Sequence, residues 1–159
     1  MREKIDTIVI HHKGRTKEST LEYIESVEML NLYVREFITP HTDHFKKPLF
    51  SGHIYKGRQT FLAYHYIIYP DGSYENPLKD EYIGWHCGNP DYNKRSIAIN
   101  IMDTLVDKEP TPKAIETTRK IIQKYQPKEI LGHGEIKQNE SCPGNTFLGE
   151  NGWKKKLVS

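Results

Sequence analysis

The chain has 159 residues, of which 36% are hydrophobic and 28% charged, with 23 Lys and Arg against 21 Asp and Glu. This length predicts a single domain, residues 1–159, whose core needs no disulfide support. The net charge of +2 is too small to indicate nucleic-acid binding as the main function. The longest apolar run, residues 61–68, is interrupted by Tyr64, His65 and Tyr66, which argues against an integral membrane protein.

The two cysteines, Cys87 and Cys142, stand beside eight histidines. The first residues of the chain lack the long apolar stretch of a secretory signal peptide. In a chain that carries no such signal, two cysteines indicate metal ligands or free thiols rather than a disulfide framework.

The first half of the chain alternates between strand and helix patterns. Residues 5–10 form an apolar, β-branched run that predicts a strand buried on both faces. Apolar residues spaced by three and four predict a helix over residues 19–37, which Pro40 ends. Residues 38–60 lack periodicity, and we expect them to form a long loop.

The second half begins with strand patterns. A strand is expected over residues 61–69, and the turn signal at residues 70–73 leads into a returning strand at Tyr74. Residues 77–95 are rich in Gly, Pro, Asn and Asp and are expected to be irregular. A buried strand follows at residues 96–102.

Three further elements complete the chain. A helix is expected to begin at Thr111, with Pro112 in its first turn, and to stop before Pro127. A short strand is expected at residues 129–131 and a last helix within residues 147–157, interrupted around Gly149 and Gly152. Strands separated by helices predict an α/β fold, with a central mixed β-sheet flanked by helices.

Three candidate metal ligands follow predicted strands. His11 lies at the end of the first strand, His133 follows the strand at residues 129–131, and Cys142 comes nine residues later. The carboxyl ends of neighbouring strands meet at one edge of an α/β domain, where sites normally form. Two imidazoles and one thiolate suit zinc and leave a fourth position for water. These residues alone equally allow a packed strand end, a turn residue and a buried small thiol.

Seven short motifs follow one another along the chain. They are residues 8–12 (IVIHH), 63–68 (AYHYII), 71–72 (DG), 84–86 (GWH), 93–99 (NKRSIAI), 132–135 (GHGE) and 141–144 (SCPG). In this order they resemble the type 2 N-acetylmuramoyl-L-alanine amidases, a family that includes phage lysins and the peptidoglycan recognition proteins. The resemblance extends over residues 5–157 and implies the α/β fold of that family.

The resemblance implies a zinc-dependent amidase that acts on bacterial peptidoglycan. Such an enzyme hydrolyses the amide bond between N-acetylmuramic acid and the first L-alanine of the stem peptide. His11, His133 and Cys142 match the zinc ligands of the family. Adjacent residues on a strand point to opposite faces, so His12 is expected to pack or to support the ligands rather than bind the same ion.

Two aromatic residues, Tyr64 and His86, match further site positions of the family. Tyr64 matches a catalytic tyrosine, whose hydroxyl can donate a hydrogen bond to a developing oxyanion. His86 matches a histidine that lines the substrate cleft, and we assign it with Trp85 to substrate binding or oxyanion support. Composition alone equally allows Tyr64 to be a core or rim tyrosine and His86 to be an ordinary loop histidine.

The group that moves protons departs from the family pattern. Many members carry a lysine or threonine two residues before the last ligand, where this chain has Glu140. Others use a glutamate on the strand where this chain has Asn100. We expect Glu140 to be the catalytic proton shuttle, because a carboxylate near zinc can accept the proton of the water. Lys137 is the alternative, and Glu135 is expected to cap a helix or support a ligand.

The long loop at residues 38–60 is expected to form one wall of the substrate groove, as variable loops do in this family. Tyr55 or Phe61 would then contact the substrate. The histidines of the loop are expected to be solvated rather than to form a second metal site. Cys87 is expected to stay a free thiol, because a disulfide to Cys142 would remove a zinc ligand.

The sequence therefore favours an enzyme, a phage or prophage endolysin that is expected to be a monomer. The alternative is a non-catalytic peptidoglycan-binding recognition domain. Non-catalytic relatives typically lose a metal ligand, whereas here the three ligand positions and Tyr64 are all filled. We further expect synthesis in the cytoplasm of the bacterial host without a signal peptide, and action on the cell wall after release.

Overall fold

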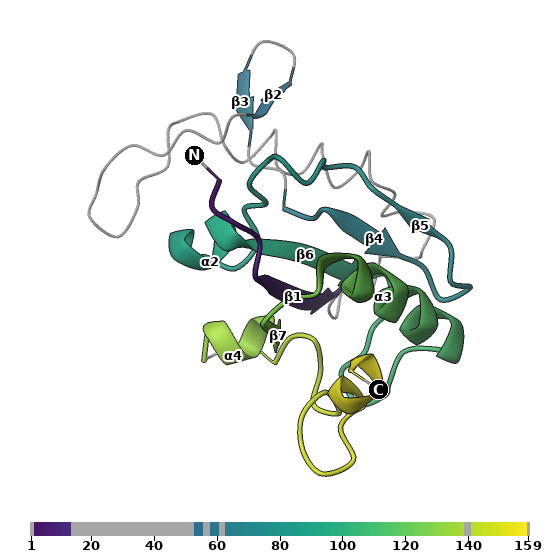
Figure 1. Ribbon diagram of the computed structural model, residues 1–159. Coiled ribbons are helices and arrows are strands. Elements are labelled where there is room, and N and C mark those ends of the chain that lie inside the picture. Colours follow the sequence, from purple (N-terminus) through teal and green to yellow (C-terminus); the bar gives the residue numbers. More distant parts are fainter. Residues whose placement is uncertain (1, 14–52, 56–57, 61–62, 139–140, 159) are drawn as a thin grey trace.

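The structure is a computed structural model of the chain. It describes residues 2–13, 53–55, 58–60, 63–138 and 141–158 (Figure 1). The helix predicted at residues 19–37 lies outside these ranges, as do Glu140 and most of the loop predicted at residues 38–60.

A five-stranded sheet with the order β5-β4-β6-β1-β7 forms the centre of the fold (Figure 1). Its strands are β1 (Thr7–His12), β4 (Tyr66–Ile68), β5 (Tyr74–Glu75), β6 (Ser96–Ile101) and β7 (Glu129–Gly132). Strand β1 pairs in parallel with β6 and β7, and β4 pairs in parallel with β6. Strand β5 pairs with β4 in the antiparallel sense, so the sheet is mixed, as predicted.

The helices and a separate hairpin surround this sheet. The α-helices are α2 (Pro90–Arg95), α3 (Pro112–Tyr125) and α4 (His133–Ile136), and the 3₁₀ helix η1 covers Trp153–Leu157. Strands β2 (His53–Tyr55) and β3 (Arg58–Thr60) pair with each other in a two-stranded antiparallel sheet. The expectation of an uninterrupted loop over residues 38–60 is therefore wrong at its C-terminal end.

Helix α3 forms where its capping residues predict it. The Thr111 hydroxyl accepts a hydrogen bond from the backbone N–H of Ala114 at 3.2 Å, and Pro112 occupies the first turn. The helix ends at Gln126, which adopts a left-handed φ of 46° and donates its N–H to the carbonyl of Ile122.

Strand β4 is shorter than the strand predicted at residues 61–69. The backbone N–H of His65 donates to the carbonyl of Ala98 at 3.0 Å, but the N–H of Ala98 donates to the ring Nδ1 of His65, also at 3.0 Å. A side chain thus takes the place of a backbone acceptor at this point. The regular ladder consequently begins one residue later, at Tyr66.

One further prediction of local structure is corrected and another is refined. The segment expected to be irregular, residues 77–95, contains α2, whose first turn is capped by the side chain of Asn89. The signal for this helix was hidden because its six residues include Pro, Asp and Asn, which also favour turns. The last predicted helix is interrupted at Gly149, as expected, where φ is +99°, and only the 3₁₀ helix η1 forms after Gly152.

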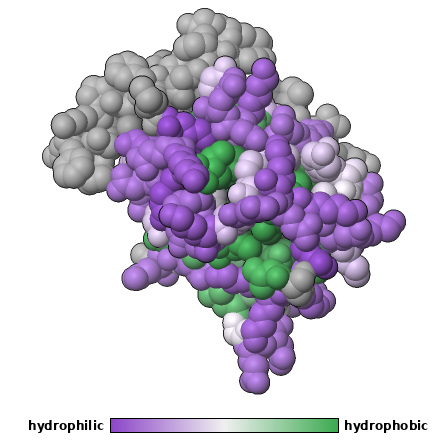
Figure 2. Space-filling model, in the orientation of Figure 1, coloured by the Kyte–Doolittle hydropathy of each residue, from purple (hydrophilic) through white to green (hydrophobic). Residues whose placement is uncertain are grey.

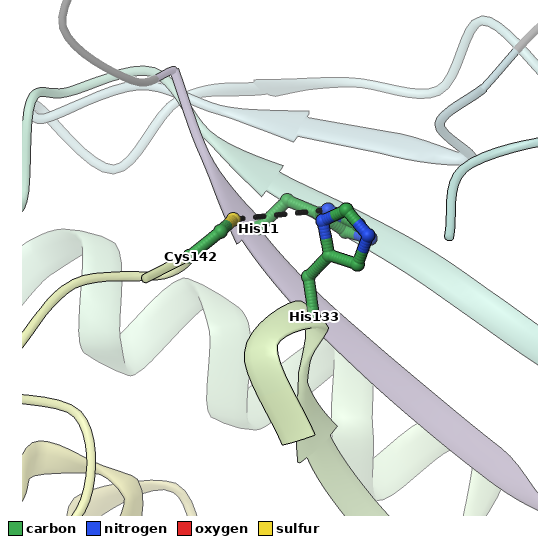
Figure 3. Close-up of side chains that lie close together, drawn as sticks. All are labelled: His11, His133 and Cys142. Atoms are coloured by element: carbon green, nitrogen blue, oxygen red, sulfur yellow. Dashed lines mark hydrogen bonds between the residues drawn. The ribbon is translucent and has the colours of Figure 1, made fainter. Parts of the chain in front are cut away.

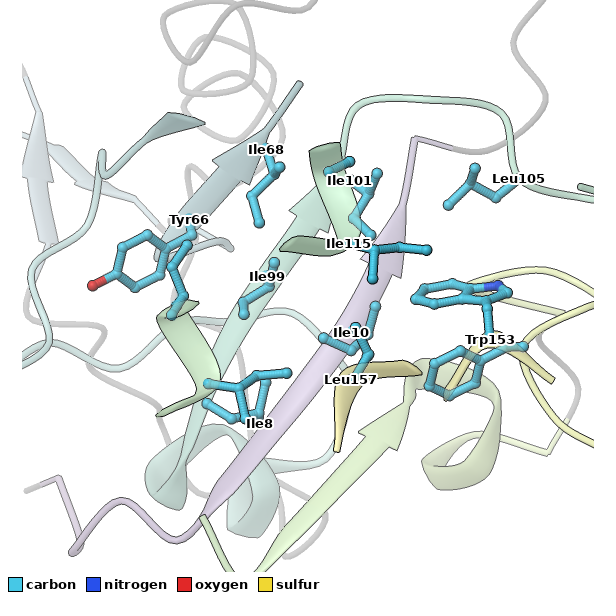
Figure 4. Close-up of a cluster of buried hydrophobic side chains, with 14 of the residues drawn as sticks. Ile8, Ile10, Tyr66, Ile68, Ile99, Ile101, Leu105, Ile115, Trp153 and Leu157 are labelled. Carbon is cyan, nitrogen blue, oxygen red and sulfur yellow. The ribbon is translucent and has the colours of Figure 1, made fainter. Parts of the chain in front are cut away.

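The main hydrophobic core lies on one face of the sheet, under α3 and η1 (Figure 4). Residues of β1 and β6 that alternate along their strands supply its sheet side: Ile8, Ile10, Ile97, Ile99 and Ile101. The rings of Phe147 and Trp153 close one end, with their centroids 4.6 Å apart. Successive side chains of a strand point to opposite faces, so the residues between these isoleucines face the other side.

The surface of the described residues is mostly hydrophilic in the view of Figure 2, where the apolar side chains gather below the middle. The large apolar or aromatic side chains that are exposed among them are Tyr74, Tyr82, Leu148 and Val158. None of the helices in the described ranges combines the length and apolar character that a membrane span requires.

Candidate metal centre and active site

The site lies where β1 and β7 end side by side. The two strands are parallel neighbours, and Ile10 pairs in register with Gly132. His11 follows the first of these residues and His133 follows the second, so both imidazoles reach the same edge of the sheet. Their ring centroids are 4.7 Å apart. The strand order therefore brings together two histidines that are far apart in the sequence.

Cys142 reaches this edge on the segment that follows α4. Its carbonyl accepts the backbone N–H of Gly134 at 2.7 Å, and its Sγ accepts the backbone N–H of His12 at 3.4 Å. Gly132 makes this close approach feasible, because a Cβ at that position would lie 2.6 Å from Cδ of Pro143. Any larger residue there would push the cysteine segment away from the strand end.

The three side chains point toward one another (Figure 3). One ligand atom from each of His11, His133 and Cys142 lies within 4.8 Å of the other two. Nδ1 of His11 is 3.9 Å from Sγ of Cys142. Tetrahedral zinc, with bonds of about 2.0 Å to nitrogen and 2.3 Å to sulfur, would place a nitrogen and a sulfur ligand about 3.5 Å apart. The donor types and their spacing fit a zinc ion that keeps one further coordination position.

Burial governs the charge state of the imidazoles at this edge. His11 is 1% exposed, and burial, with the neighbouring His133 and His12, lowers its pKa well below the ordinary value. Burial is also the largest cause that lowers the pKa of His86 well below its ordinary value. Both rings are therefore neutral at neutral pH, the state that a metal ligand requires.

His86 lies against His11 rather than on the molecular surface. It is 8% exposed, and its Nδ1 is 2.9 Å from Nε2 of His11. Its Nε2 is 2.9 Å from the hydroxyl of Ser96. The neighbouring Trp85 is half-buried.

The ring of Tyr64 also lies beside that of His11. The two ring centroids are 5.2 Å apart, and Tyr64 is half-buried. The structure therefore puts the predicted catalytic tyrosine next to the first candidate ligand.

His12 occupies the opposite face of β1, as the alternation of strand side chains predicts. Its Nδ1 accepts the backbone N–H of Leu105 at 2.9 Å, which anchors the segment after β6. Its own backbone N–H contacts the thiol of Cys142. His12 thus supports the cluster without presenting its ring to it.

Among the acidic and basic candidates for proton transfer, Glu135 has a structural role. Its Oε2 accepts the backbone N–H of Gly132 at 2.7 Å, and Lys154 contacts both carboxylate oxygens at 2.9 Å. Glu135 therefore caps α4, as predicted. Lys137 is exposed at the end of α4, and Glu140 lies outside the described residues. The identity of the proton shuttle stays a prediction.

Asn100 stands beside the site on the neighbouring strand. It pairs in register with His11 and is 1% exposed. Its Nδ2 is 3.0 Å from Sδ of Met102, and its Oδ1 has no hydrogen-bond partner among the described residues. An amide thus occupies the position where some members of the resembled family carry a carboxylate.

Two buried polar residues of the site had no role in the sequence prediction, although both lie in the motif at residues 93–99. Ser96 contacts the ring of His86. Asn93 is 3% exposed, and its Oδ1 accepts the backbone N–H of His86 at 3.2 Å. The spacing from residue 86 to residues 93 and 96 was the available signal, but it has no helix or strand period that would place them together.

Comparison with known proteins bears on this site. A sequence model of one protein family, described as N-acetylmuramoyl-L-alanine amidase, matches residues 1–145. No curated protein sequence matches the chain. The family match covers His11, Tyr64, His133 and Cys142, which are the residues that the structure brings to the sheet edge.

Several solved structures share the fold. The endolysin amidase LysCS from Clostridium intestinale matches with a TM-score of 0.63 and 18% identity, over 97% of this chain and 81% of that one. The endolysin of Thermus scotoductus bacteriophage Ph2119 matches with a TM-score of 0.64 and 17% identity, over 99% and 86%. Drosophila peptidoglycan recognition protein LB, solved in complex with tracheal cytotoxin, matches with a TM-score of 0.61 and 18% identity, over 91% and 78%.

Proposed function

Since the chain belongs to the N-acetylmuramoyl-L-alanine amidase family, we propose that it is a peptidoglycan hydrolase. The bond cleaved is the amide between N-acetylmuramic acid and L-alanine. The observation that carries this proposal is the convergence of two imidazoles and one thiol within 4.8 Å at the sheet edge, beside the ring of Tyr64. A phage or prophage endolysin is the form of this enzyme that we favour.

His11, His133 and Cys142 would hold the zinc ion. When bound, zinc supplies Lewis-acid chemistry, which polarises the scissile carbonyl and activates a water molecule. Three protein ligands leave one coordination position for this chemistry, whereas structural zinc sites normally use four. Burial of His11 keeps its ring neutral and ready to bind.

Tyr64, whose ring lies beside that of His11, is proposed to stabilise the charge that develops on the scissile carbonyl. A phenol donates a hydrogen bond, and a donor aimed at an oxyanion typically accelerates acyl transfer by about 10²–10³-fold. Trp85, half-buried next to His86, is proposed to contact the substrate. Glu140 is proposed to take a proton from the water and deliver one to the leaving amine, with Lys137 as the alternative.

The structural neighbours support peptidoglycan as the partner. Two of them are endolysins, and the third is a peptidoglycan recognition protein. That third neighbour also keeps open a second function, a domain that binds peptidoglycan without cutting it. The filled set of ligand positions favours the enzyme over the binding domain.

Zinc content and clearing of purified cell walls test the proposal. The wild type is expected to hold about one zinc per chain and to reduce wall turbidity while releasing new amino groups. Cys142→Ala should lose the metal and the clearing but still bind walls. Tyr64→Phe should keep the metal and lose about 10²–10³-fold of the rate.

Ser141→Ala is the matched control, because Ser141 is the exposed neighbour of Cys142 and should leave both zinc content and clearing unchanged. Clearing that persists without zinc and releases reducing sugar ends would indicate a glycosidase and overturn the proposal. Wall binding without any clearing by the zinc-loaded wild type would establish the binding domain instead.

A further inference from the structure

We propose that His86 is a positioning residue that selects the tautomer of His11 and so keeps Nδ1 of His11 open toward the metal site. This inference rests on the metal site of the proposed function. It gives His86 a role that acts through His11, in place of the direct contact with substrate expected from the sequence.

The two ring nitrogens of His11 face different surroundings. Nδ1 points toward Cys142, with its Sγ at 3.9 Å (Figure 3). Nε2 points the other way, to Nδ1 of His86 at 2.9 Å. A neutral imidazole carries one proton on one of its two nitrogens. The metal site is therefore usable only when that proton lies on Nε2 of His11 and is donated to His86.

The hydrogen bond between Nε2 of His86 and the Ser96 hydroxyl is compatible with donation from His11 to His86. When Nδ1 of His86 accepts from His11, its own proton lies on Nε2, which is 2.9 Å from the Ser96 hydroxyl. A hydroxyl accepts such a bond as readily as it donates one. The hydrogen bonds then run in one sense, from His11 to His86 to Ser96. The reverse sense would put a proton on Nδ1 of His11, in the space that the ion needs.

The backbone around His86 is held in place by the side chain of Asn93. Oδ1 of Asn93 accepts the backbone N–H of His86 at 3.2 Å and that of Cys87 at 3.3 Å. Asn93 lies on α2 and is 3% exposed, and Ser96 begins β6, which pairs with β1. One short segment thus connects the support of His86 to the strand that carries His11.

Burial makes the hydrogen bond between His11 and His86 important for the orientation of His11. His86 is 8% exposed and His11 is 1% exposed, so water has little access to replace a lost partner. Both nitrogens of the His86 ring are engaged, one by His11 and one by Ser96. A hydrogen-bonded partner behind a metal-binding histidine fixes its tautomer and orientation, and its loss typically weakens metal binding about 10–100-fold.

Nitrogen-15 NMR of the metal-free wild-type protein tests the tautomer directly. We expect the Nε2–H form for both His11 and His86. The Nδ1–H form at His11 would overturn the proposal. This measurement uses neither zinc nor cell walls, so its outcome is independent of whether the protein proves to be an amidase.

A pair of variants tests the consequence for metal binding. His86→Leu removes the acceptor, and the dissociation constant for zinc is expected to rise about 10–100-fold. His86→Asn returns an acceptor oxygen close to the position of Nδ1 and is expected to restore affinity to within about threefold of the wild type. Circular dichroism reports whether each variant is folded.

Ser96→Ala is a second variant that tests this chain of hydrogen bonds if His86→Leu does not fold. It leaves the bond between His11 and His86 intact and should weaken zinc binding by less than about tenfold. Unchanged zinc affinity in a folded His86→Leu, combined with a higher KM on cell walls, would instead establish His86 as a substrate contact. Zinc binding that follows this pattern in a protein that clears no walls would leave the inference standing and overturn the amidase proposal.

Discussion

The two faces of the central sheet are built from the same strands, but one forms the hydrophobic core and the other carries the candidate site. One face of β1 and β6 presents isoleucines to α3 and η1, among them Ile10 and Ile99. The opposite face presents His11 and Asn100, which pair in register and are equally buried. Both faces exclude water, so burial alone does not separate them. The difference is that burial of the isoleucine face stabilises the fold, whereas the face with His11 and Asn100 holds polar groups that need hydrogen-bond or metal partners.

This contrast explains how a small domain can carry a candidate metal-binding set of side chains. Buried apolar side chains contribute to stability without directional partners. A buried imidazole must be hydrogen-bonded or bound to a metal to offset its desolvation. The apolar face therefore stabilises the sheet, and the strands then hold the polar face in a geometry that it could not maintain by itself.

The largest effect on stability is expected from the apolar face. Ile99→Ala removes a side chain that is 0% exposed and leaves a cavity under α3. The free energy of unfolding should fall by about 2–5 kcal/mol, measured by urea denaturation. Per folded molecule, zinc content should not change. A loss below about 1 kcal/mol would show that the core can collapse around the missing group.

An intermediate effect is expected from the pH dependence of the polar face. Burial lowers the pKa of both His11 and His86 in the folded protein. Below the ordinary histidine pKa of 6.5, the unfolded chain therefore binds more protons than the folded chain. The metal-free protein should therefore lose stability as the pH falls below 6.5 toward the lowered folded-state values. Urea denaturation in the presence of a chelator, at about pH 7.5 and about pH 5.5, measures this loss of stability. These two values lie about one unit above and below the ordinary histidine pKa.

The apolar face cannot produce this dependence, because the isoleucines do not titrate. Equal midpoints at the two pH values would therefore mean that His11 and His86 are not buried in the neutral state. Excess zinc should make the stability depend less on pH, since a bound ion competes with protons for the ring nitrogens.

The smallest effect is expected at Asn100. Its Oδ1 is buried without a hydrogen-bond partner among the described residues, so Asn100→Leu removes an uncompensated polar group at similar volume. The free energy of unfolding should stay within about 1 kcal/mol of the wild type or rise. A loss comparable with that of Ile99→Ala, measured by the same denaturation, would show that the Asn100 amide has a partner that stabilises the fold.

The central strands were predictable because their periodicity is local. Six consecutive buried residues in β6 and the capped, Pro-initiated start of α3 are properties of neighbouring residues. The start of β4 was not predictable, because it depends on a hydrogen bond from Ala98 to the ring of His65, 33 residues away in the sequence. The hairpin of β2 and β3 was missed because its three-residue strands are too short to show a period.

The candidate site divides in the same way. That His11, His133 and Cys142 would meet followed from the order of motifs and from the rule that parallel strand ends converge. The neighbour on the far side of His11 did not follow, although His86 was named as a site residue. Its orientation depends on Asn93 and Ser96, which contact it from a helix and from another strand.

The sequence by itself determined the class of fold, the two faces of β1 and the donor types available to a metal. These properties depend only on the types of the residues and their order along the chain. Only the tertiary structure decided which nitrogen of His11 faces Cys142 and which faces His86. The physical reason is that a hydrogen bond depends on the direction between two groups, and that direction is set by the packing of segments distant in the chain.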